Sequence, residues 1–261
     1  MKKYVIYTAL TGSYDSLVQP KVIDDDFDYI CFTDCVKSSC IGVWNIKQIP
    51  LITHDMQRLS RFPKMHPHVL LNDYMYSVYI DANVCIYNKE FYDKIKEKIN
   101  DKILLSGIKH PLRQCVYKEF FNVWKWRKEQ SLTIMRKEFK FLKEHNFPAK
   151  YGMYEANVIF RNHHDMKVIA QCEQWWLMLN LFSKRDQLAY SFTLWQQHLT
   201  FDFLCEPGPN RENDYYYLEN HKSSGVYHSD SFLKRLSDKF MHCLFYDNCL
   251  GEKLFNAYMR I

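Results

Sequence analysis

Residues 79–83 (YIDAN) combine side chains that can hold a divalent cation. Asp81 ends an apolar run and Asn83 stands two residues later, so both side chains can reach one ion after the chain leaves a strand. Their oxygens are hard ligands, which Mg²⁺ and Mn²⁺ accept while keeping room for phosphate oxygens. The alternative is an ordinary turn, because Asp and Asn side chains readily bond the backbone that follows a strand. These residues alone leave both interpretations open.

Two other polar clusters lie in the second half of the chain. Residues 163–165 (HHD) follow an apolar run and offer metal ligands, or else they cap the helix that comes next. Residues 185–187 (RDQ) place a carboxylate at the start of a predicted helix. With Ser183 as the N-cap, Asp186 also fits the third position of a capping box, so a structural role is open here too.

These clusters need a scaffold, and the first hundred residues predict a sheet. Apolar, β-branched or aromatic runs recur at 4–10, 28–33, 43–49 and 76–81, with helical patterns such as 88–99 between or after them. Strands that alternate with crossovers form a largely parallel sheet, and ligands bind beyond the carboxyl ends of such strands. The polar residues that follow these runs should therefore meet in one crevice.

The second half of the chain predicts more helix. Helices are expected at 112–146, at 166–181 and from Ser183, and short strands at 103–108 and 155–160. Residues 205–225 have the composition of a loop, and the tail from 231 to 261 predicts a basic amphipathic helix. That helix could pack on its own domain or lie on a membrane surface.

Composition limits the function classes. Hydrophobic residues make up 47% of the 261-residue chain and charged residues 25%, so the chain can bury the core of one globular α/β domain. Only 7 glycines argue against a glycine-rich phosphate loop. A net charge of +5, with no basic and aromatic stripe, argues against nucleic acid as a partner.

Cysteine usage and apolar runs bear on location. The nine cysteines contain no CxxC pair, which predicts free thiols in a reducing compartment. The first residues predict a strand and not a signal peptide, and no apolar run reaches the ~18–20 residues that span a bilayer. We therefore expect a cytoplasmic protein, with the C-terminal helix as a candidate for peripheral contact with the inner face of a membrane.

Seven short segments, in order, resemble a known family. They are YTALTGSYD, CFTD, RLSRFPKMHPH, VYIDAN, KHPLRQ, EANVIFRNHHD and FSKRDQLAYSF, which together span roughly residues 3–200. The segment VYIDAN resembles the DxD-type motif of GT-A glycosyltransferases. The whole set resembles the glycosyltransferase-like family formerly called domain of unknown function 616. The chain departs from the DxD pattern at Asn83, where a second carboxylate is usual.

The resemblance implies one GT-A domain over residues 1–261, with a mostly parallel central sheet flanked by helices. It implies a nucleotide-binding half at 1–100, an acceptor and catalytic half at 101–205, and a helical extension at 206–261. The implied activity is transfer of a sugar from a UDP-linked donor to a glycan or glycolipid acceptor in surface polysaccharide synthesis. A divalent metal, Mn²⁺ or Mg²⁺, would neutralise charge on the departing diphosphate.

The implied donor site lies in the first half, with neutral residues at the nucleoside and charged residues at the ribose and diphosphate. Its members are Thr8, Ala9 and Tyr14 at the nucleoside, Asp34 at the base or ribose, Arg61 and Lys64 at the diphosphate or ribose, and Asp81 with Ala82 as further donor-binding residues. The metal ligands would be Asp81, Asn83 and His163. Arg61 and Lys64 also fit a pair of solvated surface cations.

Arg185, Asp186 and Gln187 resemble the family's RDQ signature. Asp186 would be the general base of an inverting reaction, or it would bind the donor sugar while Gln187 lies under the anomeric carbon in a retaining one. Arg185 would stabilise the leaving diphosphate. The acceptor-side residues would be His110, Glu155 and Asn157.

Two other classes stay open from the sequence. One is a metal-dependent hydrolase of a phosphodiester or a lipid amide, built on Asp81, His163 and His164, although the chain lacks the HxHxD spacing usual there. The other is a non-catalytic module that binds a nucleotide or a glycan. Such a module would have no turnover for an Asp186→Ala variant to lose.

Overall fold

The computed structural model describes residues 4–12, 15–35, 38–126, 128–129, 131–208, 212–221 and 249–260. Its centre is an eight-stranded sheet with the order β3-β4-β2-β1-β5-β8-β7-β9. The strands are β1 (Tyr4–Leu10), β2 (Phe27–Thr33), β3 (Cys40–Ile41), β4 (Trp44–Gln48), β5 (Tyr76–Ile80), β7 (Leu105–Lys109), β8 (Tyr154–Arg161) and β9 (Asp202–Cys205). The expected α/β class with a mostly parallel sheet is confirmed.

The directions of the strands decide which loops meet. β1 is parallel to β2 and β5, and β2 is parallel to β4. β8 is antiparallel to both of its neighbours, β5 and β7, and β7 is parallel to β9. The carboxyl ends of β1, β2, β4, β5 and β7 therefore share one edge of the sheet with the amino end of β8. We call this the active edge.

The central strands, such as β1, β2 and β5, are buried on both faces because layers cover both sides of the sheet, and their sequences are therefore near-continuous apolar runs. In β1, Val5 and Tyr7 pack into a large cluster with the helices, whereas Ile6 packs into a second cluster on the other face. Side chains that alternate along one strand thus enter two separate cores.

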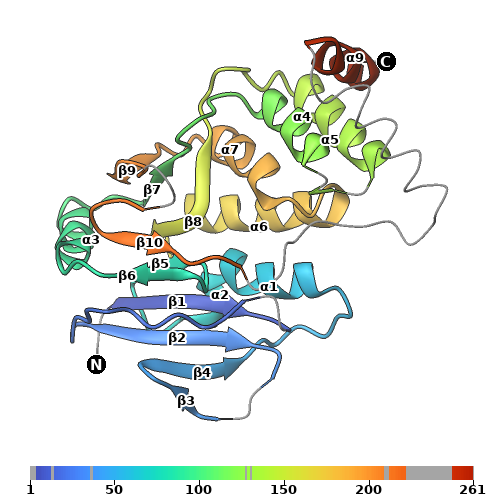
Figure 1. Ribbon diagram of the computed structural model, residues 1–261. Helices are drawn as coiled ribbons and strands as arrows, with labels where there is room; N and C mark the ends of the chain where they lie inside the picture. The colour runs from blue at the N-terminus through green and yellow to red at the C-terminus, as the bar shows by residue number, and fades with distance from the viewer. Residues whose placement is uncertain are drawn as a thin grey trace.

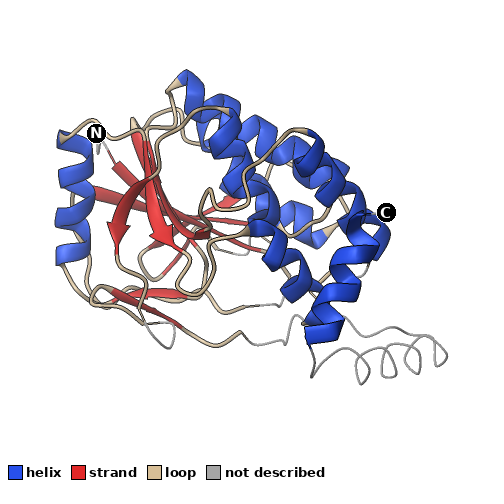
Figure 2. Cartoon of the chain, turned by 90° about the horizontal axis from the view of Figure 1, so that it is seen from above, coloured by secondary structure: helices blue, strands red, loops and turns tan. Residues whose placement is uncertain are grey.

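Helices lie mainly on one side of the sheet. That side carries α1 (Met56–Met65), α2 (Pro67–Leu70), α4 (Val116–Lys125), α5 (Leu132–Glu144), α6 (Met166–Leu181) and α7 (Asp186–Gln196) (Figure 1). The opposite face is covered by α3 (Glu90–Asn100) and by a small antiparallel pair, β6 (Val84–Ile86) and β10 (Tyr216–Leu218). Figure 2 shows the sheet between this single helix and the larger helical group.

The last helix, α9 (Cys249–Arg260), packs on α4 and α5 (Figure 1). Phe255 stacks on Trp124 with ring centroids 5.3 Å apart, and Met259 is fully buried. The rest of the predicted basic tail, including residues 231–245, lies outside the described residues. Within the part of the chain that the structure describes, no helix is both long and apolar enough to cross a bilayer.

Candidate active site

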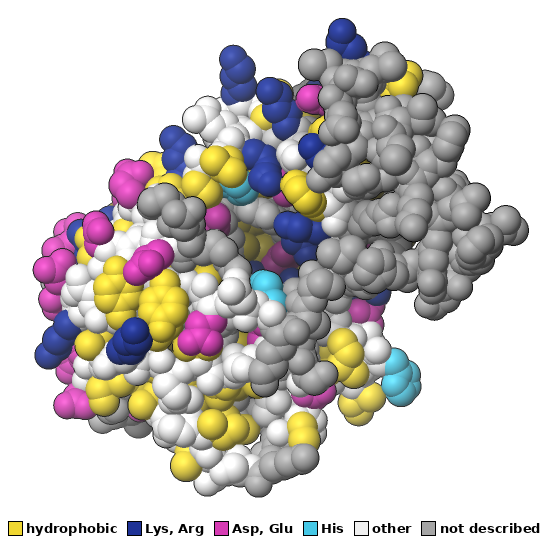
Figure 3. Space-filling view, viewed as in Figure 1, with side chains coloured by type: hydrophobic (Ala, Val, Ile, Leu, Met, Phe, Trp, Pro, Cys, Tyr) yellow, Lys and Arg dark blue, Asp and Glu magenta, His cyan; other side chains and the backbone are white. Residues whose placement is uncertain are grey.

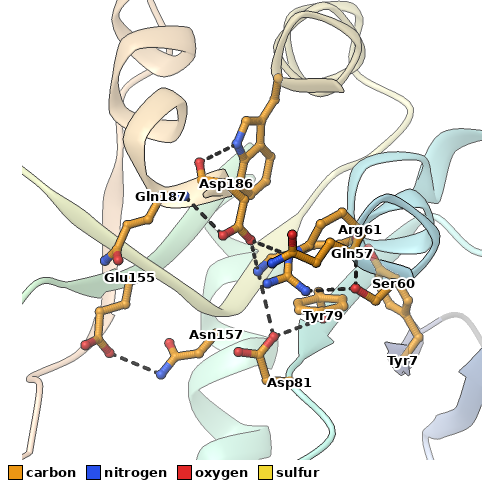
Figure 4. Close-up of polar contacts among 12 residues, drawn as sticks. Tyr7, Gln57, Ser60, Arg61, Tyr79, Asp81, Glu155, Asn157, Asp186 and Gln187 are labelled. Atoms are coloured by element: carbon orange, nitrogen blue, oxygen red, sulfur yellow. Dashed lines mark hydrogen bonds and ion pairs between the residues drawn. The ribbon is translucent and has the colours of Figure 1, made fainter. Parts of the chain in front are cut away.

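An ion pair between two buried side chains forms the centre of the site. Lys64, near the end of α1, donates from Nζ to Oδ2 of Asp186, the first residue of α7, over 2.7 Å. Their side chains are only 3% and 8% exposed. Arg61, one turn earlier on α1, places Nε 3.2 Å from the same oxygen. Figure 4 shows the Asp186 carboxylate turned toward Arg61. Arg61 and Lys64 are therefore not a solvated surface pair.

Asp81 faces this pair from the end of β5. Nζ of Lys64 lies 3.7 Å from Oδ1 of Asp81, and the Tyr79 hydroxyl donates to that oxygen over 2.9 Å. The backbone N–H of Asp81 donates to the carbonyl of Asn157 on β8 over 2.8 Å. Since the Asp81 side chain is 37% exposed, Lys64 stands between one buried carboxylate and one that solvent can reach.

Neighbouring charges keep Asp186 ionised. Burial alone would raise the pKa of Asp186, but Lys64 and Arg61 hold that pKa well below its usual range. Its second oxygen, Oδ1, accepts from the backbone N–H of Gln187 over 3.1 Å. Both carboxylate oxygens are thus engaged. The Lys64 ammonium lies 5.0 Å from the Tyr79 ring, close enough for a cation–π contact.

The start of α7 explains why Asp186 is free to pair with Lys64. Ser183 was expected to cap this helix, but its Oγ accepts from the backbone N–H of Arg185 over 3.1 Å. The helix begins at Asp186, with Arg185 in the N-cap position. The predicted capping box is therefore wrong: Asp186 occupies the first helical position, where its Oδ1 accepts from the Gln187 backbone and its Oδ2 is left to pair with Lys64.

Two buried donors hold the backbone behind the ion pair. Arg161, at the end of β8 and fully buried, donates from Nη2 to the Lys64 carbonyl over 2.8 Å and to the Tyr7 hydroxyl over 2.6 Å. Trp175 of α6 donates from Nε1 to the Asp186 carbonyl over 2.8 Å. Sequence reasoning missed these supports. The one signal for them was an arginine at the end of an otherwise apolar strand.

Only part of the expected metal-ligand set fits a divalent cation. Oδ2 of Asp81 accepts no hydrogen bond from the described residues and belongs to a side chain that solvent reaches, so it fits as a ligand. The Asn83 side chain is held by its Nδ2, which donates to the carbonyl of Glu219 over 2.8 Å, whereas its Oδ1 is buried without a hydrogen-bond partner. Asn83 as a second ligand therefore stays a prediction. In the described ranges, no group of three or more His, Cys, Asp or Glu side chains is arranged for a metal.

His163 lies at the opposite edge of the sheet. In the antiparallel register Ile80 pairs with Val158, so the chain that leaves β8 emerges far from Asp81. His163 is fully buried, and its Nε2 contacts the Leu71 carbonyl at 3.1 Å. The prediction that His163 completes the coordination of Asp81 is wrong for this reason. The same separation removes the ligand set that the hydrolase alternative required.

The residues expected against the nucleoside differ in accessibility. Thr8 is fully buried and its Oγ1 has no hydrogen-bond partner, so its side chain offers no surface to a ligand in this structure, and its place against a nucleoside stays a prediction. Ala9 and Ala82 are 9% and 7% exposed and lie at the active edge, where only their backbone has room to meet a ligand. Tyr14 lies outside the described residues.

Asp34 follows β2 at the active edge, as expected. Its carboxylate accepts from the backbone N–H of Gly12, with distances of 3.2 and 3.3 Å to the two oxygens. The side chain is exposed, so it joins the loops after β1 and β2 and still faces solvent. A ligand at this corner would meet a carboxylate that is already oriented.

The expected acceptor residues also lie at the active edge. Nδ2 of Asn157 donates to Oε2 of Glu155 over 3.1 Å, and both stand at the amino end of β8 beside Asp81 (Figure 4). His110 follows β7, and its Nδ1 accepts from the backbone N–H groups of Leu112 and Arg113, each over 3.1 Å. Burial, together with Arg113, lowers the pKa of His110 to about 4, so the ring is neutral at pH 7.

One family model matches most of the chain. It is described as TOD1/MUCI70, glycosyltransferase-like domain, and it matches residues 1–205. No curated protein matches the chain. The matched range contains every side chain of the cluster around Lys64.

Solved structures offer more distant likenesses. S. aureus TarS 1-349 in complex with UDP-GlcNAc is 10% identical with a TM-score of 0.46, over 97% of this chain and 69% of that one. A longer S. aureus TarS is 11% identical with a TM-score of 0.42, and this chain spans 36% of its length while 83% of this chain is covered. Mouse xyloside xylosyltransferase 1 in its apo form is 8% identical with a TM-score of 0.42, over 77% of this chain and 83% of that one.

Proposed function

This chain belongs to the TOD1/MUCI70 glycosyltransferase-like family, and on that premise we propose that it moves a sugar from a nucleotide-sugar donor to a glycan or glycolipid acceptor. The observation that supports this most directly is the arrangement of Asp81, Lys64 and Asp186 at the active edge. Open α/β sheets bind ligands beyond the carboxyl ends of their strands, and this cluster lies there.

The donor is a UDP-sugar in this proposal, with its diphosphate beside Asp81 and Lys64. Sugar transfer leaves a nucleoside diphosphate whose terminal phosphate gains negative charge as the glycosidic bond breaks. A cation held beside that phosphate lowers the barrier because it meets charge that develops in the transition state. Lys64 supplies such a cation, and Arg61 adds a second positive group one helical turn away.

A divalent metal remains part of the proposal, held by Asp81 through Oδ2. When bound, Mn²⁺ or Mg²⁺ would supply further positive charge to the diphosphate oxygens. Among the described residues around Lys64, Oδ2 of Asp81 is the exposed carboxylate oxygen that suits this purpose, and Oδ1 of Asn83 is a second candidate ligand. The remaining ligands would come from the donor diphosphate and water, a coordination that Mg²⁺ commonly adopts.

Asp186 is proposed to position the donor sugar and not to remove a proton from the acceptor. An effective general base has a pKa near the working pH, whereas Lys64 and Arg61 hold the pKa of Asp186 well below its usual range. An ionised carboxylate in this place can accept hydrogen bonds from sugar hydroxyls. Gln187 points from the same first turn of α7 toward β8, where its Nε2 lies 3.5 Å from the Tyr154 carbonyl.

The test is thermal stability of the purified protein with UDP, GDP, CMP and ADP, each with and without Mn²⁺. A ligand that binds the native state raises the unfolding midpoint. At a hundredfold excess over Kd it adds about 2.7 kcal/mol to the free energy of unfolding. We expect UDP with Mn²⁺ to give the largest shift. No shift from any nucleotide, together with a large shift from metal alone, would contradict the donor site. The cytoplasmic location and the role in surface polysaccharide synthesis stay predictions from the sequence.

A further inference from the structure

A cavity of about 480 Å³ opens at the active edge, between the end of β7 and the start of α4. Its lining carries three cations, Lys109, Arg113 and Lys118, against one carboxylate, Glu206. His110 also lines the cavity, and it adds no charge because its ring is neutral at pH 7. The lining is therefore positive overall. In Figure 3, Lys and Arg side chains gather over this part of the surface, and one lies within the central hollow.

More positive charge stands behind the cavity wall. The buried carboxylate of Glu119 pairs with Arg113, whose Nε lies 2.5 Å from Oε2. Arg185 and Lys128 act on the same carboxylate electrostatically. Neither makes an ion pair with any described residue, and Nε of Arg185 is buried without a hydrogen-bond partner. Three cations, Arg113, Lys128 and Arg185, thus act on the one buried carboxylate of Glu119, and Arg185 also acts on Asp186.

Lys128 is affected both by burial and by a neighbouring cation. Partial burial, and next the guanidinium of Arg185, lower the pKa of Lys128. An anion placed among these groups would relieve the repulsion. Like charges that lie close together cost stability, so a bound anion would offset part of the cost of placing Arg113, Lys128 and Arg185 in one region.

The cavity lies beside the proposed donor site. His110 and Lys109 follow the same edge as Asp81, since Ile108 of β7 pairs with Glu155 of β8. Arg185 joins the two places, because it directly precedes Asp186 and also acts on Glu119. A molecule in the cavity could therefore reach a sugar held at Asp186. An acceptor would need such a position.

We propose that the acceptor is anionic: a glycan that carries a phosphate or carboxylate group, which binds in this cavity against Arg113, Lys109 and Lys118. The proposal rests on the proposed function, since it names the acceptor class for the same transfer. A guanidinium can grip two oxygens of either group, and the exposed lysines add attraction that salt screens. Pro111 and Leu112 provide apolar surface in the same lining for a sugar ring.

The test uses the whole chain with three probes, glucose 6-phosphate, glucuronic acid and glucose, each titrated with and without saturating UDP and Mn²⁺. Binding is followed by NMR or calorimetry. We expect at least one charged sugar to bind ten times more tightly than glucose, and to do so in the presence of UDP, because the two sites are separate. Raising the salt concentration from 50 to 300 mM should lower the affinity for the charged sugar and leave the affinity for glucose unchanged.

Charge reversal locates the binding site. Lys109 and Lys118 are exposed, so the K109E/K118E variant should fold normally and lose at least tenfold in affinity for the charged sugar. The matched control is K137E/K167E, which makes the same charge change at two exposed lysines on α5 and α6. Arg113→Gln is a less clean variant, because it leaves the buried Glu119 without its partner.

The outcomes separate the two proposals. A preference for phosphate or for carboxylate supports the anion site and identifies which group it takes. Equal binding of all three sugars, or unchanged affinity in K109E/K118E, overturns the anionic acceptor while UDP binding still supports the donor site. Charged-sugar binding that UDP displaces means that this cavity takes the donor phosphate, which also overturns the inference. Charged-sugar binding without any nucleotide binding contradicts the proposed function instead.

Discussion

Lys64 lies in contact with acidic residues from two elements and with two aromatic rings, so a single side chain couples α1, β5 and α7. Its substitution should therefore affect stability as well as turnover. Lys64→Met leaves Asp186 ionised and buried without its nearest cation, which should cost about 3 kcal/mol of unfolding free energy in a urea titration. Turnover should fall about 100-fold, the usual effect of removing one preorganised electrostatic group.

A double variant checks that assignment. In the Asp186→Asn background the buried negative charge is absent, so adding Lys64→Met should cost much less than it does alone. The difference between the two costs is the coupling free energy, expected at 1 kcal/mol or more for residues in contact. Additive costs would mean that the 2.7 Å ion pair does not contribute to stability.

Asp81 differs from Asp186 because solvent already reaches it. Asp81→Asn should keep the fold, since the Tyr79 hydroxyl can donate to an amide oxygen as well. The affinity for UDP in Mn²⁺ should fall at least tenfold, whereas the affinity in EDTA should not change, and calorimetry measures both. The matched control is Asp73→Asn, an exposed acid in the loop before β5. If the affinity for UDP falls equally with and without metal, Asp81 does not bind the metal.

At the scale of elements, burial patterns predict that a strand exists but not which way it runs. The sequence placed strands near 4–10, 28–33, 43–49, 76–81, 103–108 and 155–160, and all six are present. A strand buried on both faces has the same burial pattern in either direction, because side chains alternate with a period of two. Nothing local therefore indicated that β8 is antiparallel to β5, and His163 was assigned to the wrong edge.

Site residues that follow strands could be predicted from the sequence. Buried residues that hold the site in place could not. Asp81, Asp34 and His110 stand at strand ends, so a rule about parallel sheets located them. Arg161 and Trp175 act from the interior through hydrogen bonds to backbone carbonyls. Large buried side chains are usually packing residues, and no sequence pattern separates the few that also orient an active site.

The docking of α9 on α4 and α5 gives a prediction for one element. Phe255 is buried against Phe121 and Trp124, with ring centroids 5.6 and 5.3 Å apart. Phe255→Ala should cost about 3 kcal/mol of local stability and speed cleavage of the C-terminal segment by chymotrypsin. Leu254→Ala is the control, since that neighbouring side chain is 46% exposed. Equal cleavage of the two variants would contradict the packing described for α9.

Across the whole molecule, the two halves of the chain contribute different parts of one edge. The first hundred residues bring Asp34, Lys64 and Asp81 to it, and residues 101–205 bring the basic cavity and Asp186. The antiparallel β8 lies between β5 and β7 and joins them, so that the proposed donor and acceptor positions are neighbours. Substitutions in one half should therefore affect ligand binding by the other, through β8 and through the Lys64–Asp186 pair.

Stability of the whole chain should fall in acid because of a buried histidine. Burial lowers the pKa of His163 to about 4, below its ordinary value of 6.5. Between these values the unfolded chain binds more protons than the native one, so stability is fully present above pH 6.5 and is lost as the pH falls toward 4. From pH 7 to 4.5 this group should remove about 2 to 3 kcal/mol, by the linkage relation.

His163→Gln isolates that contribution, since a glutamine amide can still donate to the Leu71 carbonyl and does not titrate. Urea titrations at pH 7 and 4.5 should show a smaller loss of unfolding free energy in His163→Gln than in the unsubstituted chain, by that same amount. His164→Gln is the matched control, because the neighbouring ring is exposed. If His163→Gln and the unsubstituted chain lose equal stability, protonation of His163 is not linked to unfolding, and the acid sensitivity comes from other groups, such as His110 or the carboxylates that Lys and Arg side chains hold ionised.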